Sequence, residues 1–156
     1  MRTGILFAAT FLSPALLLLG ADRQFSGNWV LEVAQSDFGN AARPTKGVAT
    51  YTVRGDVVNA IQTSYLGGAP QKNRLTWYLD GLQHPSQQPA PGYSVTHWKN
   101  HTLVNERSSN DGLYKQTIRV TLSPDGKTAT EIMDTKTPQG SNHEKLVWKK
   151  AGSGGG

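Results

Sequence analysis

Hydrophobic and polar residues alternate along most of this chain, in short runs separated by clusters of glycine, proline and aspartate. In the first run, Trp29 and Leu31 fall on one side and Val30 falls on the other. A period of two is typical of a β-strand that buries one face. Nine such runs are predicted as strands, over residues 27–33, 48–54, 57–65, 73–79, 93–99, 102–108, 113–122, 128–135 and 143–149.

The runs are joined by short turn signals such as Gly55-Asp56, Asp80-Gly81 and Asp111-Gly112. Glycine supplies the positive φ that tight reversals need, and consecutive strands joined by short turns usually pair with each other. The sequence therefore predicts an all-β fold, an antiparallel up-and-down meander closed into a β-barrel of about eight to nine strands with little helix.

Two stretches interrupt this meander. Residues 83–91 contain three prolines, and we expect a surface loop there because a proline-rich segment does not fit within a sheet. Residues 34–38 are predicted to form the one helical turn, before Arg43-Pro44 leads back to the sheet.

The N-terminal residues have the outline of a secretory signal peptide, with a basic start, an apolar stretch and small residues at Gly20 and Ala21. The apolar stretch contains a proline and is shorter than the ~20 residues that a transmembrane helix needs. We therefore expect a signal peptide at 1–21, a barrel domain at 22–150 and a flexible Gly/Ser tail at 151–156. Such a protein is exported to the periplasm or the extracellular space and has no permanent membrane anchor.

Composition narrows the function classes. The absence of cysteine excludes a disulfide framework, a thiolate metal site and the lipid-modified cysteine of a bacterial lipoprotein. The formal net charge is +5, but the Lys and Arg residues are scattered along the chain. Nucleic-acid binding needs a clustered basic face, so no nucleic-acid partner is expected.

Motifs for catalysis are not found. The sequence has no Gly-x-Ser-x-Gly, no His-Glu-x-x-His, no glycine-rich phosphate loop and no cysteine nucleophile, so we expect no catalytic residue and no cofactor. His97 and His101 flank a predicted hairpin turn and lack a third ligand, so no metal site is predicted. An enzyme would need an acid–base pair inside the barrel. The carboxylates considered for one are expected to face water: Glu106, Asp111, Glu131 and Asp134.

The stretch at 26–38, which contains Gly27-Asn28-Trp29, resembles the opening of small exported bacterial lipocalin-like proteins, a family of calycin-type β-barrels. Three later stretches, at 78–85, 122–128 and 137–150, are similar to the same family in the same order. The resemblance implies a barrel whose biochemical role is, for this family, generally unassigned. Lipocalin-like barrels as a class often hold small apolar molecules.

The resemblance also gives Gly27 and Trp29 a structural place at one end of the barrel. Trp29 is expected to seal the closed end, with a cation such as Arg119 or Lys149 packed on its ring. Ala129 and Glu131 depart from the family, whose pattern is usually aliphatic in that strand.

Six residues are predicted to line the barrel interior and contact a ligand: Tyr51, Ile61, Leu75, Trp77, Trp98 and Tyr114. An aromatic and aliphatic lining with sparse polar groups suits a small hydrophobic molecule. The leading interpretation is therefore a non-enzymatic barrel that binds such a molecule. The alternative is a barrel filled by these side chains, which acts through its loops as an interaction or envelope-structural module.

Overall fold

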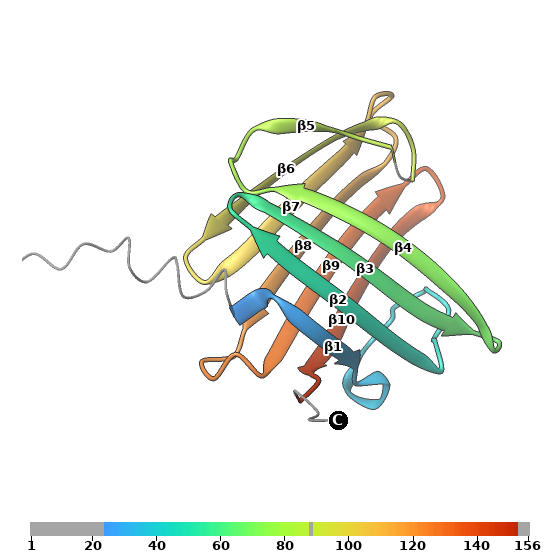
Figure 1. Ribbon diagram of the computed structural model, residues 1–156. Helices are drawn as coiled ribbons and strands as arrows, with labels where there is room; N and C mark the ends of the chain where they lie inside the picture. The colour runs from blue at the N-terminus through green and yellow to red at the C-terminus, as the bar shows by residue number, and fades with distance from the viewer. Residues whose placement is uncertain (1–23, 88, 153–156) are drawn as a thin grey trace, which may run out of the picture.

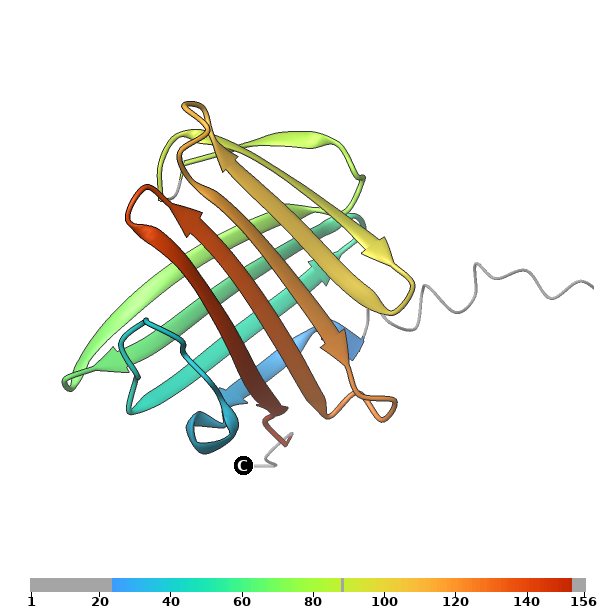
Figure 2. The same ribbon diagram turned by 180° about the vertical axis from the view of Figure 1, so that it is seen from behind.

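One antiparallel sheet, curved into a barrel, makes up most of the structure (Figures 1 and 2). The computed structural model describes residues 24–152, apart from residue 88. This part of the chain contains ten strands and the short 3-10 helix η1 (Val33–Gln35). The strands are β1 (Gly27–Leu31), β2 (Lys46–Arg54), β3 (Val57–Leu66), β4 (Ala69–Tyr78), β5 (Gln83–Ser86), β6 (Gly92–Lys99), β7 (Thr102–Ser109), β8 (Lys115–Leu122), β9 (Thr128–Thr137) and β10 (Gly140–Lys150).

The strands follow the predicted meander. Their order in the sheet is β4-β3-β2-β1-β10-β9-β8-β7-β6-β5, and every neighbouring pair is antiparallel. The first and last strands are neighbours, with Trp29 opposite Lys150. The two edges of the sheet, β4 and β5, do not pair with each other, and at this seam β4 lies against β6. The barrel is therefore almost closed (Figure 2).

The tenth strand corrects the expectation for residues 83–91. Gln83–Ser86 pairs with β6, and Pro85 lies opposite Tyr93. A proline has no N–H to donate to a ladder. In a central strand every N–H bonds to one neighbour or the other, whereas in an edge strand every second N–H points away from the sheet and needs no ladder partner. The position of β5 at the edge of the sheet explains why a proline-containing segment is tolerated there.

Aromatic side chains pack together where the segment before β1 meets the barrel. Trp29 is buried, and its indole Nε1–H donates a hydrogen bond of 3.1 Å to the carbonyl oxygen of Phe25. The Phe25 ring lies 4.7 Å from the ring of Tyr51, which in turn lies 6.4 Å from that of Trp77. These side chains form the core between the N-terminal segment and β2 to β4.

The cation on Trp29 is Lys150, which corrects the expectation of Arg119 or Lys149. The Lys150 Nζ atom lies 5.3 Å from the ring centroid, because the pairing of β1 with β10 places Lys150 directly opposite Trp29. Arg119 and Lys149 pair instead with carboxylates, at 2.7 Å and 3.4 Å. At Gly27, where φ is +135°, a Cβ atom would lie 2.8 Å from Lys150 Cε, so this position requires glycine.

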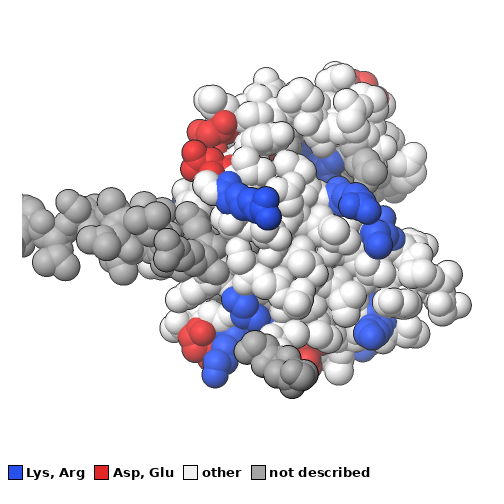
Figure 3. Space-filling model, in the orientation of Figure 1, with Lys and Arg blue, Asp and Glu red and all other residues white. Residues whose placement is uncertain are grey.

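The predicted signal peptide at 1–21 and most of the tail, residues 153–156, lie outside the described residues. Between residues 24 and 152, with residue 88 left out, no helix is long and apolar enough to span a bilayer. On the face seen in Figure 3, Lys and Arg side chains form several small groups separated by uncharged surface.

Candidate ligand-binding site

A cavity of about 490 Å³ lies inside the barrel, toward the end at which β1 finishes. This volume is within the ~300–1,000 Å³ of ordinary small-molecule sites. Its aliphatic and aromatic wall comes from the inward faces of the strands, at Leu31, Leu75, Ile118, Met133, Leu146 and Trp148. Its mouth is formed by the segment between β1 and β2, the β3–β4 turn and the β5–β6 connection, at Phe38, Ala41, Ala42, Pro44, Leu66 and Pro89.

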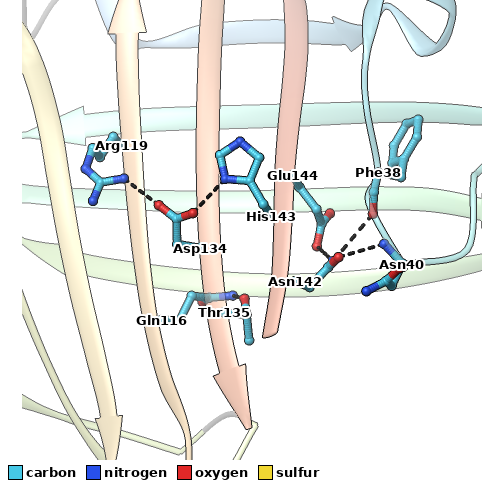
Figure 4. A network of polar contacts seen from close by, with 9 residues as sticks. All are labelled: Phe38, Asn40, Gln116, Arg119, Asp134, Thr135, Asn142, His143 and Glu144. Atoms are coloured by element: carbon cyan, nitrogen blue, oxygen red, sulfur yellow. Dashed lines mark hydrogen bonds and ion pairs between the residues drawn. The ribbon is translucent and has the colours of Figure 1, made fainter. Parts of the chain in front are cut away.

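Asn142 of β10 ties the segment between β1 and β2 to the barrel wall (Figure 4). Its Oδ1 atom accepts a hydrogen bond of 2.6 Å from the backbone N–H of Asn40. Its Nδ2 group donates to the carbonyl oxygen of Phe38 at 3.4 Å and to Oε1 of Glu144 at 2.8 Å. The residue therefore couples the mouth of the cavity to a carboxyl group in its wall.

The cavity is more polar than the sequence analysis expected. Polar side chains enter it from six strands and from the residue before β8, at Gln62, Ser64, Gln71, Asn73, Arg107, Tyr114, Gln116, Glu131 and Glu144. The expectation of sparse polar groups was wrong because the inward positions of several strands change from apolar near the closed end to polar near the mouth. On β7, for example, Leu103 is followed inward by Asn105 and Arg107.

Glu131 is the most deeply buried carboxyl group in the described part of the chain, with 4% of its surface exposed. Its Oε2 atom accepts a hydrogen bond of 2.9 Å from Nε1 of Trp148. Burial raises the pKa of Glu131 to about 7, the negative charge of Glu144 acts in the same direction, and the Trp148 hydrogen bond opposes both. The expectation that Glu131 faces water was wrong, because it shares the inward face of β9 with the buried Ala129.

Tyr51 lies beside this group. Its hydroxyl oxygen accepts a hydrogen bond of 2.7 Å from Nε2 of Gln62. Burial and the nearby charge of Glu131 raise the pKa of the Tyr51 phenol far above its ordinary value. The phenol therefore stays neutral and can donate or accept a hydrogen bond.

Arg107 brings a positive charge to the wall near the seam. Its NH2 group donates a hydrogen bond of 2.7 Å to Oγ of Ser86 on β5. Partial burial lowers the pKa of Arg107, but a guanidinium stays charged in proteins. The ion pairs among the described residues involve neither Arg107, Glu131 nor Glu144, so the charged groups of the cavity wall are not neutralised by partners within the chain.

The structure places the six residues predicted to contact a ligand in different parts of the barrel. Leu75 and Tyr114 line the cavity. Tyr51 and Trp77 belong to the core next to it, and Trp98 packs against that core without reaching the cavity. Contact of Leu75 and Tyr114 with a ligand stays a prediction.

Ile61 lies on the outer face and corrects the prediction that it points inward. It is 39% exposed, whereas the adjacent Ala60 is 3% exposed. Its neighbours across the ladder are Thr50 on β2 and Arg74 on β4, which are exposed as well. The inward residues of β3 are the even-numbered ones, Val58, Ala60, Gln62 and Ser64.

A second hollow, of about 690 Å³, lies on the outer face of β6 to β10. Charged side chains of both signs line it, among them Glu106, Lys115 and Asp134. Asp134 accepts hydrogen bonds from Arg119 at 2.7 Å and from His143 at 2.6 Å (Figure 4). Asp134 is 45% exposed and paired with these two side chains of the same surface, so this cluster has the features of a solvated surface. Within the described ranges there is no group of three or more His, Cys, Asp or Glu that could hold a metal ion.

The solved structures that resemble this chain share its fold, whereas its sequence alone finds no match. The sequence matches no protein-family model and no curated protein. Among solved structures, fatty-acid-binding protein 1 of Echinococcus granulosus is 12% identical, with a TM-score of 0.61, over 83% of this chain and 98% of that chain. A zebrafish ileal bile acid-binding protein in complex with cholic acid is 17% identical, with a TM-score of 0.56, over 82% and 99% of the two chains.

A secretory abundant heat soluble protein from Ramazzottius varieornatus is 11% identical, with a TM-score of 0.60, over 82% of this chain and 96% of that chain. Identities this low establish the architecture alone. The chain has a calycin-type β-barrel fold.

Proposed function

We propose that this protein binds a small molecule with a substantial apolar part inside its barrel. The observation that carries the proposal is the cavity of about 490 Å³ behind an apolar mouth. A void of this size costs stability in a barrel that serves only as a scaffold, because the side chains around it lose packing contacts. The cavity therefore favours binding over the alternative of a completely filled interaction module.

The similar structures support the same interpretation by analogy. Two of them are named for fatty-acid and bile-acid binding, and both ligands are amphiphiles with a large apolar part. The leader at 1–21 adds the proposal that binding takes place after export.

The proposal is tested by filling the cavity. Ser64 lines the cavity from β3, and Thr63 lies on the other face of the same strand. We expect Ser64→Trp to weaken binding of the neutral fluorescent probe N-phenyl-1-naphthylamine at least tenfold, because the indole occupies the space that the probe needs. Thr63→Trp is the matched control and should bind the probe as the wild type does. Equal binding by all three proteins, or none by the wild type, would contradict the proposal.

A further inference from the structure

Two carboxyl groups line the cavity wall on neighbouring strands. Glu131 on β9 is opposite Leu146, and Glu144 on β10 is opposite Met133, so the two glutamates are diagonal neighbours on the inward face. Diagonal neighbours on one face of a sheet lie about 7–8 Å apart, within reach of long side chains. The charge of Glu144 raises the pKa of Glu131, so the two groups interact electrostatically inside the barrel.

Both carboxyl groups have acceptor capacity that the protein does not use. Among the residues that the structure describes, Trp148 alone donates a hydrogen bond to Glu131, and Asn142 alone donates one to Glu144. An ionised carboxylate offers about four acceptor positions. Because both groups border the cavity, the remaining positions are offered to a molecule that enters it.

No positive side chain of the described chain neutralises this pair. The ion pairs that the structure contains involve other carboxylates. Arg107 and Lys72 border the same cavity. The Arg107 guanidinium donates to Ser86 at the seam, and neither cation forms an ion pair with the two glutamates or is among the groups that shift the pKa of Glu131. A buried carboxylate without a counter-charge is costly, and a ligand can supply the missing charge.

We propose that the cavity takes an amphiphile with a protonated amine, whose ammonium group binds the carboxyl groups of Glu131 and Glu144 while its apolar part lies against the aliphatic wall. This inference rests on the proposed function and adds the chemistry of the headgroup. An ammonium supplies three hydrogen-bond donors and one positive charge. A carboxylate headgroup in the same place would add a third negative charge beside two others.

Binding of an ammonium group should release a proton near neutral pH. Burial holds the pKa of Glu131 at about 7, so part of the population is protonated at that pH, and a bound cation lowers this pKa again. Affinity for the amine should therefore increase as the pH rises through 7. The titratable groups that face Glu131 or share the cavity wall are Glu144, Tyr51, Arg107, Tyr114 and Lys72.

The test compares three ligands with one alkyl chain and different headgroups, namely dodecylamine, dodecanol and dodecanoate, below their micelle concentrations. At pH 8, isothermal titration calorimetry should show dodecylamine binding about tenfold or more tighter than the other two. At pH 5.5 this preference should fall several-fold. At pH 7, titrations in two buffers with different ionisation enthalpies should show proton release for the amine only. These measurements need no variant, so they do not depend on mutant folding.

Isosteric variants locate the headgroup. Glu131→Gln keeps an oxygen that can accept from Trp148, and it should lose the preference for the amine and the proton release while still binding dodecanol. Glu144→Gln should weaken amine binding with a smaller effect on the pH profile. Glu106→Gln, on the exposed outer side of β7, is the matched control and should behave as the wild type.

Each other outcome overturns the inference in a recognisable way. If dodecanoate binds most tightly and Arg107→Gln removes that binding, the cavity is an anion-headgroup site, and the proposed function stands without this inference. A preference for the amine that survives in both glutamate variants places the ammonium elsewhere. If none of the three ligands binds the wild type, the proposed function and the inference fail together.

Discussion

The indole Nε1–H of Trp148 donates a hydrogen bond of 2.9 Å to the carboxyl group of Glu131 on the neighbouring strand. Trp148 belongs to the core cluster and also lines the cavity. The bond therefore connects the packed end of the barrel to its polar interior. Because it favours the ionised form of Glu131, it also lowers the cost of keeping a carboxylate at this depth.

Replacing Trp148 with Phe should raise the pKa of Glu131 above its present value of about 7, because the ionised form loses its donor. The free energy of unfolding should fall by about 1–3 kcal/mol at pH 8, where the unpartnered carboxylate is charged. Carbon-13 NMR titration of the Glu131 carboxyl carbon measures the first effect, and urea unfolding measures the second. An unchanged titration curve would contradict the role given to this bond.

The raised pKa of Glu131 predicts that stability falls as the pH rises. Between the ordinary glutamate pKa of 4.5 and the folded-state pKa of about 7, the folded state holds a proton that the unfolded state has lost, so each pH unit costs stability in this window. The contribution of Glu131 to the free energy of unfolding is fully present at low pH and is lost as the pH rises through 7. It amounts to about 3 kcal/mol at most. Urea unfolding from pH 5 to 8 should show this decline in the wild type and a flatter profile in Glu131→Gln.

The surface aspartates act in a different pH window. Burial raises the pKa of Glu144 as well, so Glu144 contributes in the same direction as Glu131 and is still present in Glu131→Gln. Hydrogen bonds lower the pKa values of Asp80, Asp111, Asp125 and Asp134 below 3.8. Groups of this kind contribute stability above their unfolded pKa and lose it as the pH falls through the folded pKa. Their effect is therefore confined to acid conditions below the range of the experiment, and a wild-type profile as flat as that of Glu131→Gln would count against the buried carboxyl.

Trp77 should behave as a core residue rather than as a ligand contact. It is 3% exposed and packs against Tyr51, so Trp77→Ala should lower the free energy of unfolding by about 3–5 kcal/mol. Leu75→Ala removes a half-buried wall residue of the cavity on the same strand, and it should cost less stability and change ligand affinity more. Urea unfolding and a probe titration on both variants check the contrast, which a reversed order would refute.

Asn142 should control how firmly the mouth segment is held. Asn142→Ala removes the acceptor for the Asn40 N–H and the donor to Phe38, so amide hydrogen exchange at Asn40 should accelerate about tenfold or more. Dissociation of a bound probe should become faster as well. Ser141→Ala, at an exposed neighbouring position, serves as the control. Exchange at Asn40 that is equally slow in both variants would show that other contacts hold the segment.

The regular part of this fold could be predicted from local sequence. Period-two alternation placed Trp29, Leu75 and Trp77 on the inward face and predicted the meander, because the pattern depends only on residues next to each other. The strand β5 was missed because Pro85 reads as a break when nothing in the sequence shows that the segment lies at an edge.

The polar interior could not be predicted from the alternation of apolar and polar residues, because that pattern does not show how neighbouring strands are aligned. Glu131 was expected in water, since a lone carboxylate is rarely buried, yet Ala129 two positions earlier lies on the same inward face. The diagonal placement of Glu144 beside it follows from the register of β9 with β10. The same kind of register decides that Lys150 rather than Lys149 lies on Trp29.

The seam between β4 and β5 leaves two strand edges without a ladder partner, in a chain that has no disulfide to restrain them. Unpaired edges are templates on which other chains can add strands, and charged residues and prolines on an edge oppose this. β4 carries Lys72 and Arg74, and β5 carries Pro85. These residues oppose the addition of a strand from a second chain at the opening of the barrel, so protection of the two edges takes the place of complete closure.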